Sequence, residues 1–197
     1  MIFIGIDPGL GGAVAVIHPE FDGKAPVVVF DTPSCAVTRS GKHRHEYLIE
    51  VMRDILMREA RTDCESFAVL EAVHSMPGQG VSSCFSFGRG LGIWEGLLVG
   101  CGIPYQKIAP QTWKKDLLRD MARDNKDSSR IAAMRLFPSM SEQLARKKDD
   151  GRAEAILLAE FGRRLRKGTI YIIPLTSVRE SSTITTVERR SDDHSTV

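Results

Sequence analysis

Acidic side chains directly follow two apolar segments of this chain. Asp7 comes after the apolar run at residues 2–6, and Glu71 comes after the run at residues 67–70. In open α/β sheets the ends of the strands face the functional crevice. A carboxylate at such a position is costly to bury unless it binds a cation or another partner. The two acids therefore predict a binding site at one edge of a sheet.

A third acidic group lies in residues 147–154, which read Lys-Lys-Asp-Asp-Gly-Arg-Ala-Glu. Asp150 and Glu154 are four residues apart and share one face if a single helix includes both. A divalent cation between two such carboxylates would remove their mutual repulsion. Asp149 is a further candidate, although Asp149 and Asp150 are also suited to cap the helix that follows.

Together these acids predict a site for hard cations. Magnesium prefers oxygen ligands in octahedral geometry. Two metal ions about 4 Å apart activate a water and stabilise the leaving oxygen of a phosphodiester. A single acid after a strand is often only a turn former, so the interpretation depends on the joint pattern. The predicted catalytic and metal-binding residues are Asp7, Glu71, Asp150 and Glu154, with Asp149 in reserve.

Other kinds of site have little support in the sequence. It contains no Gly-x-Ser-x-Gly motif, and its four cysteines form no Cys-x-x-Cys pair, which favours reduced thiols in a cytoplasmic protein. No run of about 18 apolar residues predicts a membrane helix, and the first residues lack the features of a signal peptide. Residues 41–45, with His43 and His45, are interpreted as a solvated basic loop rather than a zinc site.

The charge is unevenly distributed along the chain. The formal net charge is only +2. Residues 107–167, however, carry 16 basic and 9 acidic side chains, and such asymmetry suggests an anionic partner. For any single lysine a solvated surface is the simpler interpretation. The predicted contacts to phosphate groups of such a partner are Lys107, Lys114, Lys115, Lys126, Arg130, Lys147 and Lys148.

The periodicity of apolar residues predicts an α/β fold with a mixed sheet. The expected strands are at residues 2–6, 13–17, 26–30, 67–70 and 104–108, and the expected helices at 45–60, 85–99, 111–118, 128–137 and 150–166. Trp94 and Trp113 are predicted to be buried. Core packing is also predicted for Phe85 and Phe87, with stacking on DNA bases as the alternative.

Several ordered motifs resemble RuvC-type Holliday junction resolvases of the RNase H-like superfamily, and most of all their phage-encoded members. The motifs are Ile4-Gly5-Ile6-Asp7-Pro8-Gly9 with Gly12-Ala13-Val14-Ala15, Val69-Leu70-Glu71, Gly88-Arg89-Gly90-Leu91-Gly92, residues 126–138, and Asp150-Gly151-Arg152-Ala153-Glu154-Ala155. Asp7 and Glu71 match the family pattern directly. In the family pattern the last two acids are three residues apart. In this chain the residue three positions before Glu154 is Gly151, which cannot be a ligand.

The resemblance implies a mixed five-stranded RNase H-like sheet with helices on both faces. It places a nuclease domain at residues 1–168, and residues 169–197 are expected to form a largely disordered tail because they are rich in serine and threonine. It also implies a homodimer that cleaves four-way DNA junctions with magnesium or manganese, in DNA recombination and repair.

The expected function is therefore that of a magnesium-dependent endodeoxyribonuclease that resolves Holliday junctions or related branched DNA by two-metal-ion hydrolysis. One alternative is an ATP-binding domain of the actin or sugar-kinase type, which also opens with a strand, an Asp and a glycine-rich hairpin. Such proteins need two domains, and this chain has room for one. The other alternative is a non-catalytic junction-binding protein, against which the four acids argue.

Overall fold

A computed structural model describes residues 1–19, 26–39, 41–60, 64–72, 78, 80–121 and 127–168. The predicted tail at 169–197 and the predicted phosphate contact Lys126 lie outside the described residues. In the described part of the chain, no helix is both long and apolar enough to cross a membrane.

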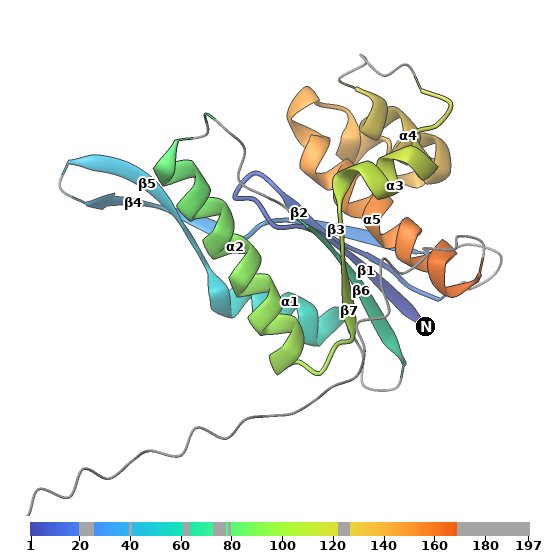
Figure 1. Ribbon diagram of the computed structural model, residues 1–197, viewed down its shortest axis with the longest axis horizontal. Helices are drawn as coiled ribbons and strands as arrows, with labels where there is room; N and C mark the ends of the chain where they lie inside the picture. Colours follow the sequence, from blue (N-terminus) through green and yellow to red (C-terminus); the bar gives the residue numbers. More distant parts are fainter. Residues whose placement is uncertain are drawn as a thin grey trace, which may run out of the picture.

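A mixed five-stranded sheet forms the centre of the molecule, as predicted (Figure 1). Its strands are β1 (Ile2–Asp7), β2 (Ala13–Ile17), β3 (Val27–Asp31), β6 (Ser66–Glu71) and β7 (Tyr105–Ile108), in the order β3-β2-β1-β6-β7. β1 is antiparallel to β2 and parallel to β6, which is parallel to β7. Because Ile6 is in register with Leu70, β1 and β6 end together and bring Asp7 and Glu71 to the same edge.

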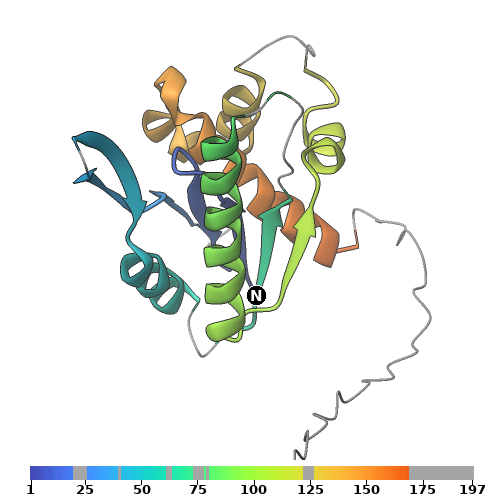
Figure 2. The same cartoon turned by 60° about the vertical axis from the view of Figure 1, so that its left-hand side comes forward.

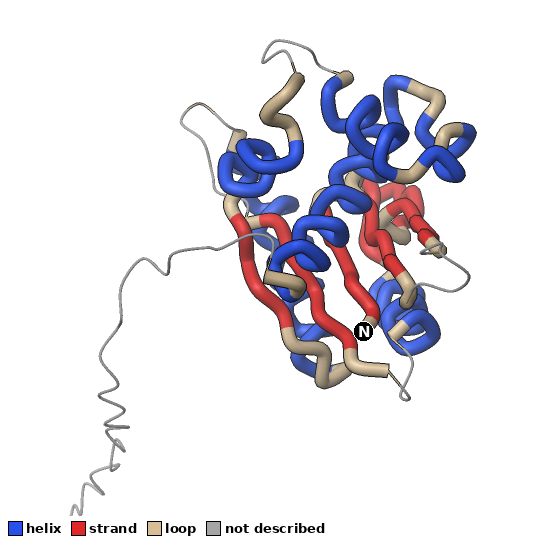
Figure 3. Tube along the Cα trace, turned by 90° about the vertical axis from the view of Figure 1, so that its right-hand side faces the viewer, coloured by secondary structure: helices blue, strands red, loops and turns tan. Residues whose placement is uncertain are grey.

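Helices cover both faces of the sheet, which confirms the second part of the prediction (Figures 1 and 3). α1 (Ile49–Glu59) and α2 (Val81–Gly100) cover one face, and α2 runs along the sheet in Figure 2. α3 (Pro110–Leu117), α4 (Ser128–Leu136) and α5 (Asp150–Arg166) cover the other. Trp94 anchors the first layer and Trp113 the second, and both are fully buried as predicted.

The helix α5 lies directly against β1. A Cβ atom at Gly5 would collide with the backbone of Ala155 and Ala159, so only glycine permits this approach. Alternate side chains of β1 face the two layers, with Phe3 toward α5 and Ile4 toward the side of α1 and α2. Short 3-10 turns, η1 (Pro138–Met140), η2 (Glu142–Leu144) and η3 (Lys147–Asp149), lead from α4 into α5.

One region differs from the sequence-based prediction. The segment expected to be a basic loop belongs to a two-stranded hairpin of β4 (Ser34–Arg39) and β5 (Lys42–Tyr47), and α1 begins at Ile49 rather than at residue 45. In β5 every residue except Tyr47 is polar, which conceals the alternation that marks a strand. The hairpin projects from the sheet in Figure 1, and at its base the Tyr47 hydroxyl donates a 3.5 Å hydrogen bond to the carbonyl of Pro8.

Candidate functional site

Asp7 occupies the end of β1 and is partly buried. Its Oδ1 accepts a 3.4 Å hydrogen bond from the backbone N–H of Gly9. A Cβ atom at Gly12 would lie 2.8 Å from Asp7 Cγ, and one at Gly151 would lie 3.3 Å from Oδ2. Burial raises the pKa of the Asp7 carboxyl to about 7, and the charges of Glu71 and Glu154 add to this effect. A carboxyl with this pKa gains strongly from a nearby cation.

Glu71 ends the neighbouring strand β6 and is only 6% exposed. The indole Nε1–H of Trp113 on α3 donates a 3.0 Å hydrogen bond to its Oε1. Burial raises the pKa of the Glu71 carboxyl, the hydrogen bond from Trp113 opposes that rise, and the charge of Glu154 adds to it.

Glu154 approaches the same edge from α5, one turn into the helix. Its Oε1 accepts a 3.1 Å hydrogen bond from Ser129 Oγ and lies 2.8 Å from Lys114 Nζ. Its charge raises the pKa of both Asp7 and Glu71, so three carboxylates from three elements interact electrostatically. The structure thus brings together three of the four predicted acids.

Asp150, the fourth predicted acid, is the first residue of α5 and its side chain is half exposed. Its Oδ1 lies 3.5 Å from Arg130 Nε. Burial raises the pKa of this carboxyl and Arg130 lowers it, while Asp127, Glu154 and Asp149 have smaller effects. Asp150 therefore lies at the rim of the site, beside a basic side chain.

Asp149, the reserve candidate, has a structural environment. It is 3% exposed, and its carboxylate accepts hydrogen bonds from the backbone and guanidinium of Arg146 just before α5 begins. These bonds hold the pKa of Asp149 below its usual value. Asp149 occupies the N-cap position of α5, but its side chain makes no capping hydrogen bond to that helix and instead closes the preceding turn η3.

The donor chemistry of the site fits a hard divalent cation. Asp7, Glu71 and Glu154 supply carboxylate oxygens of the kind that magnesium prefers. Burial, with the charges of Glu71 and Glu154, raises the pKa of Asp7, and a nearby cation would favour its ionised form. Among the described residues, no three His, Cys, Asp or Glu side chains form a ready-made metal cluster. Glu154 instead contacts Lys114 and Ser129.

A cavity of about 600 Å³ opens beside Asp7, between the glycine turn and the first turns of α2. Tyr47, Ser83 and Phe87 are among the residues that line it. Phe85 is 74% exposed and Phe87 is 40% exposed, so the predicted core packing of these two residues is wrong. The buried positions of α2 are instead Gly90, Trp94 and Leu98. Phe85 lies on the opposite side of the helix, whereas Phe87 lies one turn before Gly90 on the same side, where it lines the cavity beside Asp7 instead of packing in the core.

Most of the predicted phosphate contacts are described. Lys115, Lys147 and Lys148 are exposed on the side of the sheet covered by α3 and α5. Lys107 lies 2.8 Å from Glu95, in a partly exposed pair. Arg130 differs from the others because its side chain is only 11% exposed. Its guanidinium contacts Asp127 and donates to the carbonyls of residues 144 and 145, so it joins α4 to the segment before α5.

Comparisons with known proteins were made by sequence and by fold. No protein-family model matches the chain. Over 95 residues, 48% of this chain, it is 34% identical to the chloroplastic Holliday junction resolvase MOC1 of Chlamydomonas reinhardtii. The aligned part spans only 11% of the length of that protein.

The solved structure of RuvC from Thermus thermophilus matches with a TM-score of 0.53 and 16% identity, over 86% of this chain and 98% of that one. The chain has the RuvC fold. RuvC from the same organism in complex with a Holliday junction substrate gives a TM-score of 0.55 at 14% identity, over 84% and 96% of the two chains. The resemblance to RuvC-type resolvases and the predicted RNase H-like architecture are therefore confirmed.

Three residues contact the acids of this site, and the sequence did not predict these contacts. Trp113 was expected only in the core, Lys114 only as a phosphate contact, and Ser129 was not singled out. The pairs Glu71–Trp113 and Glu154–Ser129 are 42 and 25 residues apart. The available signal was the placement of Trp113 and Lys114 on a short amphipathic helix that directly follows β7.

Proposed function

We propose that this chain is an endodeoxyribonuclease of the crossover-junction type that resolves Holliday junctions or related branched DNA. The observation that carries the proposal is the meeting of Asp7, Glu71 and Glu154 at one edge of a RuvC-type sheet. Sequence similarity to a resolvase supports the substrate class.

The cofactor in this proposal is Mg²⁺, with Mn²⁺ as a substitute. A pair of such ions would polarise the scissile phosphate and lower the pKa of the attacking water. Asp7, Glu71 and Glu154 would hold them, and Asp150 would complete the set from the rim. Gly12 and Gly151 leave the space in which the Asp7 carboxylate lies, since a side chain at either position would crowd it.

Exposed lysines near the acids are proposed to hold the DNA backbone. Lys147 and Lys148 precede α5, and Lys115 follows the lysine that contacts Glu154. Phosphate contacts of this kind provide affinity and salt dependence but little sequence information. Because the guanidinium of Arg130 is committed to intramolecular contacts, we assign it a structural role rather than a phosphate contact.

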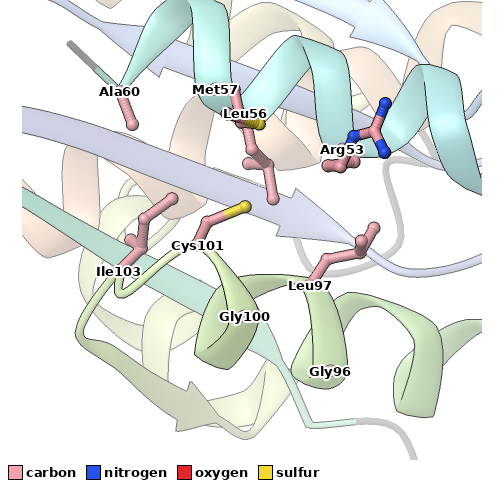
Figure 4. A pocket seen from close by; sticks show the side chains of 9 residues that line it. All are labelled: Arg53, Leu56, Met57, Ala60, Gly96, Leu97, Gly100, Cys101 and Ile103. Atoms are coloured by element: carbon pink, nitrogen blue, oxygen red, sulfur yellow. The ribbon is translucent and has the colours of Figure 1, made fainter. Parts of the chain in front are cut away.

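The proposed assembly is a homodimer formed through α2, because resolution of a four-way junction requires two incisions. Gly88, Gly92, Gly96 and Gly100 recur once per turn, and a Cβ atom at each would meet open space. Val81, Phe85 and Val99 add exposed apolar surface to this helix. An apolar groove of about 390 Å³ between α1 and α2 extends the surface (Figure 4). Small residues at one-turn spacing allow a second helix to approach closely.

The decisive experiment compares cleavage of synthetic four-way junctions, three-way branches, flaps and linear duplexes in Mg²⁺ and in EDTA. We expect preference for branched DNA and no cleavage in EDTA. Asp7→Asn should abolish cleavage while junction binding survives, and Glu154→Gln should be severely impaired. Full activity of Asp7→Asn would overturn the mechanism. Strong thermal stabilisation by ATP without any DNA cleavage would instead favour the kinase-like alternative.

The dimer is tested separately by sedimentation. Gly92→Leu adds a side chain to the open face of α2 and should shift the protein to the monomer. Val51→Leu, on the exposed side of α1, is the matched control and should leave the association unchanged. A wild-type chain that is monomeric at micromolar concentrations, with and without junction DNA, would contradict the proposed assembly.

A further inference from the structure

The two tryptophans of this chain have opposite hydrogen-bonding environments. Both are fully buried, one on each side of the sheet. Trp113 Nε1 donates to Glu71 Oε1 at 3.0 Å. Trp94 Nε1, although equally buried, has no partner among the described residues. A buried indole N–H usually finds an acceptor, so this fold tolerates an unpartnered indole at one position and directs the other at an acid of the site.

We propose that Trp113 is a positioning residue for the metal site, whose indole holds Glu71 Oε1 and so fixes the orientation in which this carboxylate would bind a cation. This inference rests on the proposed function, because it takes Glu71 as a metal ligand. Partners that hydrogen-bond to metal ligands orient them and commonly change metal affinity by about 10–100-fold when removed.

The neighbouring residue strengthens the argument. Lys114 follows Trp113 on α3, and its Nζ lies 2.8 Å from Glu154 Oε1 and 5.0 Å from the centre of the Trp113 ring. One short helix thus presents a donor to each of two acids that come from β6 and α5. Because Trp113 is part of the core beneath α5, its ring has little freedom to turn away from Glu71.

The matched substitutions are Trp113→Phe and Trp94→Phe. Both remove similar volume from the core, but only the first removes a hydrogen bond. We measure Mn²⁺ binding to the full chain by calorimetry, without DNA, and the Mg²⁺ concentration that gives half-maximal junction cleavage. Trp113→Phe should weaken Mn²⁺ binding and raise the half-maximal Mg²⁺ concentration by roughly 10-fold. Trp94→Phe should change either quantity less than twofold.

A double-mutant cycle connects the effect to Glu71. In a Glu71→Gln background, Trp113→Phe should no longer change Mn²⁺ affinity, because the carboxylate that it positions is gone. A purely structural role would leave the effect of Trp113→Phe the same in both backgrounds. Equal effects of Trp113→Phe and Trp94→Phe, or an undiminished effect in the Glu71→Gln background, overturn the proposal.

A measurement on the unmodified chain covers the case in which Trp113→Phe does not fold. The two indole N–H resonances are followed by NMR during addition of Mg²⁺, and the spectrum of Trp94→Phe assigns them. The Trp113 resonance should shift and that of Trp94 should not; a stationary Trp113 resonance at saturating Mg²⁺ contradicts the inference. A chain that binds Mn²⁺ with this dependence on Trp113 but cleaves no branched DNA would refute the proposed function and leave the positioning role intact. Normal cleavage and an unchanged Mg²⁺ requirement after Trp113→Phe would refute the positioning role and leave the proposed function intact.

Discussion

Arg146 and Asp149 bind each other across the turn that opens α5. The backbone N–H of Arg146 donates to Asp149 Oδ2 at 2.8 Å, and its guanidinium donates to Oδ1 at 2.8 Å. The acid is almost fully buried, and this pair fixes the direction in which α5, and with it Glu154, leaves the preceding 3-10 turn.

Asp149→Asn should therefore reduce stability rather than activity. We expect the melting temperature at pH 7 to fall by roughly 2–4 °C, the range for the loss of one net hydrogen bond in a chain of this size. Because the pKa of Asp149 is lowered in the folded state, its contribution is present above the unfolded pKa and disappears as the pH falls through the folded value. Junction cleavage should remain close to that of wild type. A dead Asp149→Asn variant beside an active Glu154→Gln variant would reverse our assignment of these acids.

Asp7 should destabilise the metal-free protein at neutral pH. Its folded pKa of about 7 lies above the usual value of 3.8, so the folded state binds the proton more tightly. The contribution of Asp7 to stability in EDTA is then greatest below pH 4 and falls as the pH rises toward 7. Asp7→Asn should remove this slope and raise stability at pH 8 by up to a few kcal/mol, since one pKa unit corresponds to about 1.4 kcal/mol. Thermal melts across pH 4–8 check this, and a lower stability of Asp7→Asn at pH 8 would contradict it.

Gly151→Ala should damage the site although it changes no acid. A Cβ atom at Gly151 would lie 2.5 Å from the Gly11 carbonyl oxygen and 2.9 Å from Gly12 Cα, so the glycine turn or the start of α5 must move. We expect cleavage to fall at least about tenfold, as small displacements in active sites commonly cause. Gly151→Asp would restore the three-residue acid spacing and should fail for the same reason. Gly11→Ala meets open space and is the control; equal losses for Gly11→Ala and Gly151→Ala would argue against this explanation.

Substitutions of Lys115 and Arg130 should have different effects. The first should weaken DNA binding, and the second should lower folding stability. Lys115→Ala removes an exposed charge, so junction affinity should fall and the slope of log K against log salt should decrease by about 1. Arg130→Ala removes the ion pair with Asp127 and the hydrogen bonds to the carbonyls of residues 144 and 145, and should cost roughly 2–4 kcal/mol of folding stability. Binding titrations at several salt concentrations and chemical unfolding measure the two effects. Normal stability of Arg130→Ala with lost DNA affinity would return this residue to the phosphate-binding set.

The sequence predicted the elements whose signals are local. β1, β2 and α5 have clear periodicity with a glycine turn or a charged start, and the acids at the ends of β1 and β6 follow from the strand boundaries alone. The β4–β5 hairpin was missed because β5 is polar at every position except Tyr47 and β4 has only three consecutive apolar residues, Cys35, Ala36 and Val37. Phe85 was misassigned because α2 also carries apolar residues on its exposed side. Phe87 was misassigned because the core covers the line of residues 98, 94 and 90 but no longer covers residue 87, one turn earlier on the same side.

The contacts made by the acids could not be predicted in the same way. Whether Asp149 or Glu154 faces Asp7 depends on the direction in which α5 begins after the 3-10 turns. Helix propensity does not specify that direction. The donors to Glu71 and Glu154 come from helices elsewhere in the chain, so their identity depends on tertiary packing.

The contact of Gly5 with Ala155 and Ala159 has a consequence for how such chains diverge. The spacing between the strand that carries Asp7 and the helix that carries Glu154 is set by backbone meeting backbone. A methyl group at position 5 would look conservative in an alignment, yet it would act as a loss-of-function allele by separating two acids that it never touches. Substitutions at this contact between the first strand and the last helix should therefore be tolerated only in combination. We expect the two segments to show correlated substitutions among related chains.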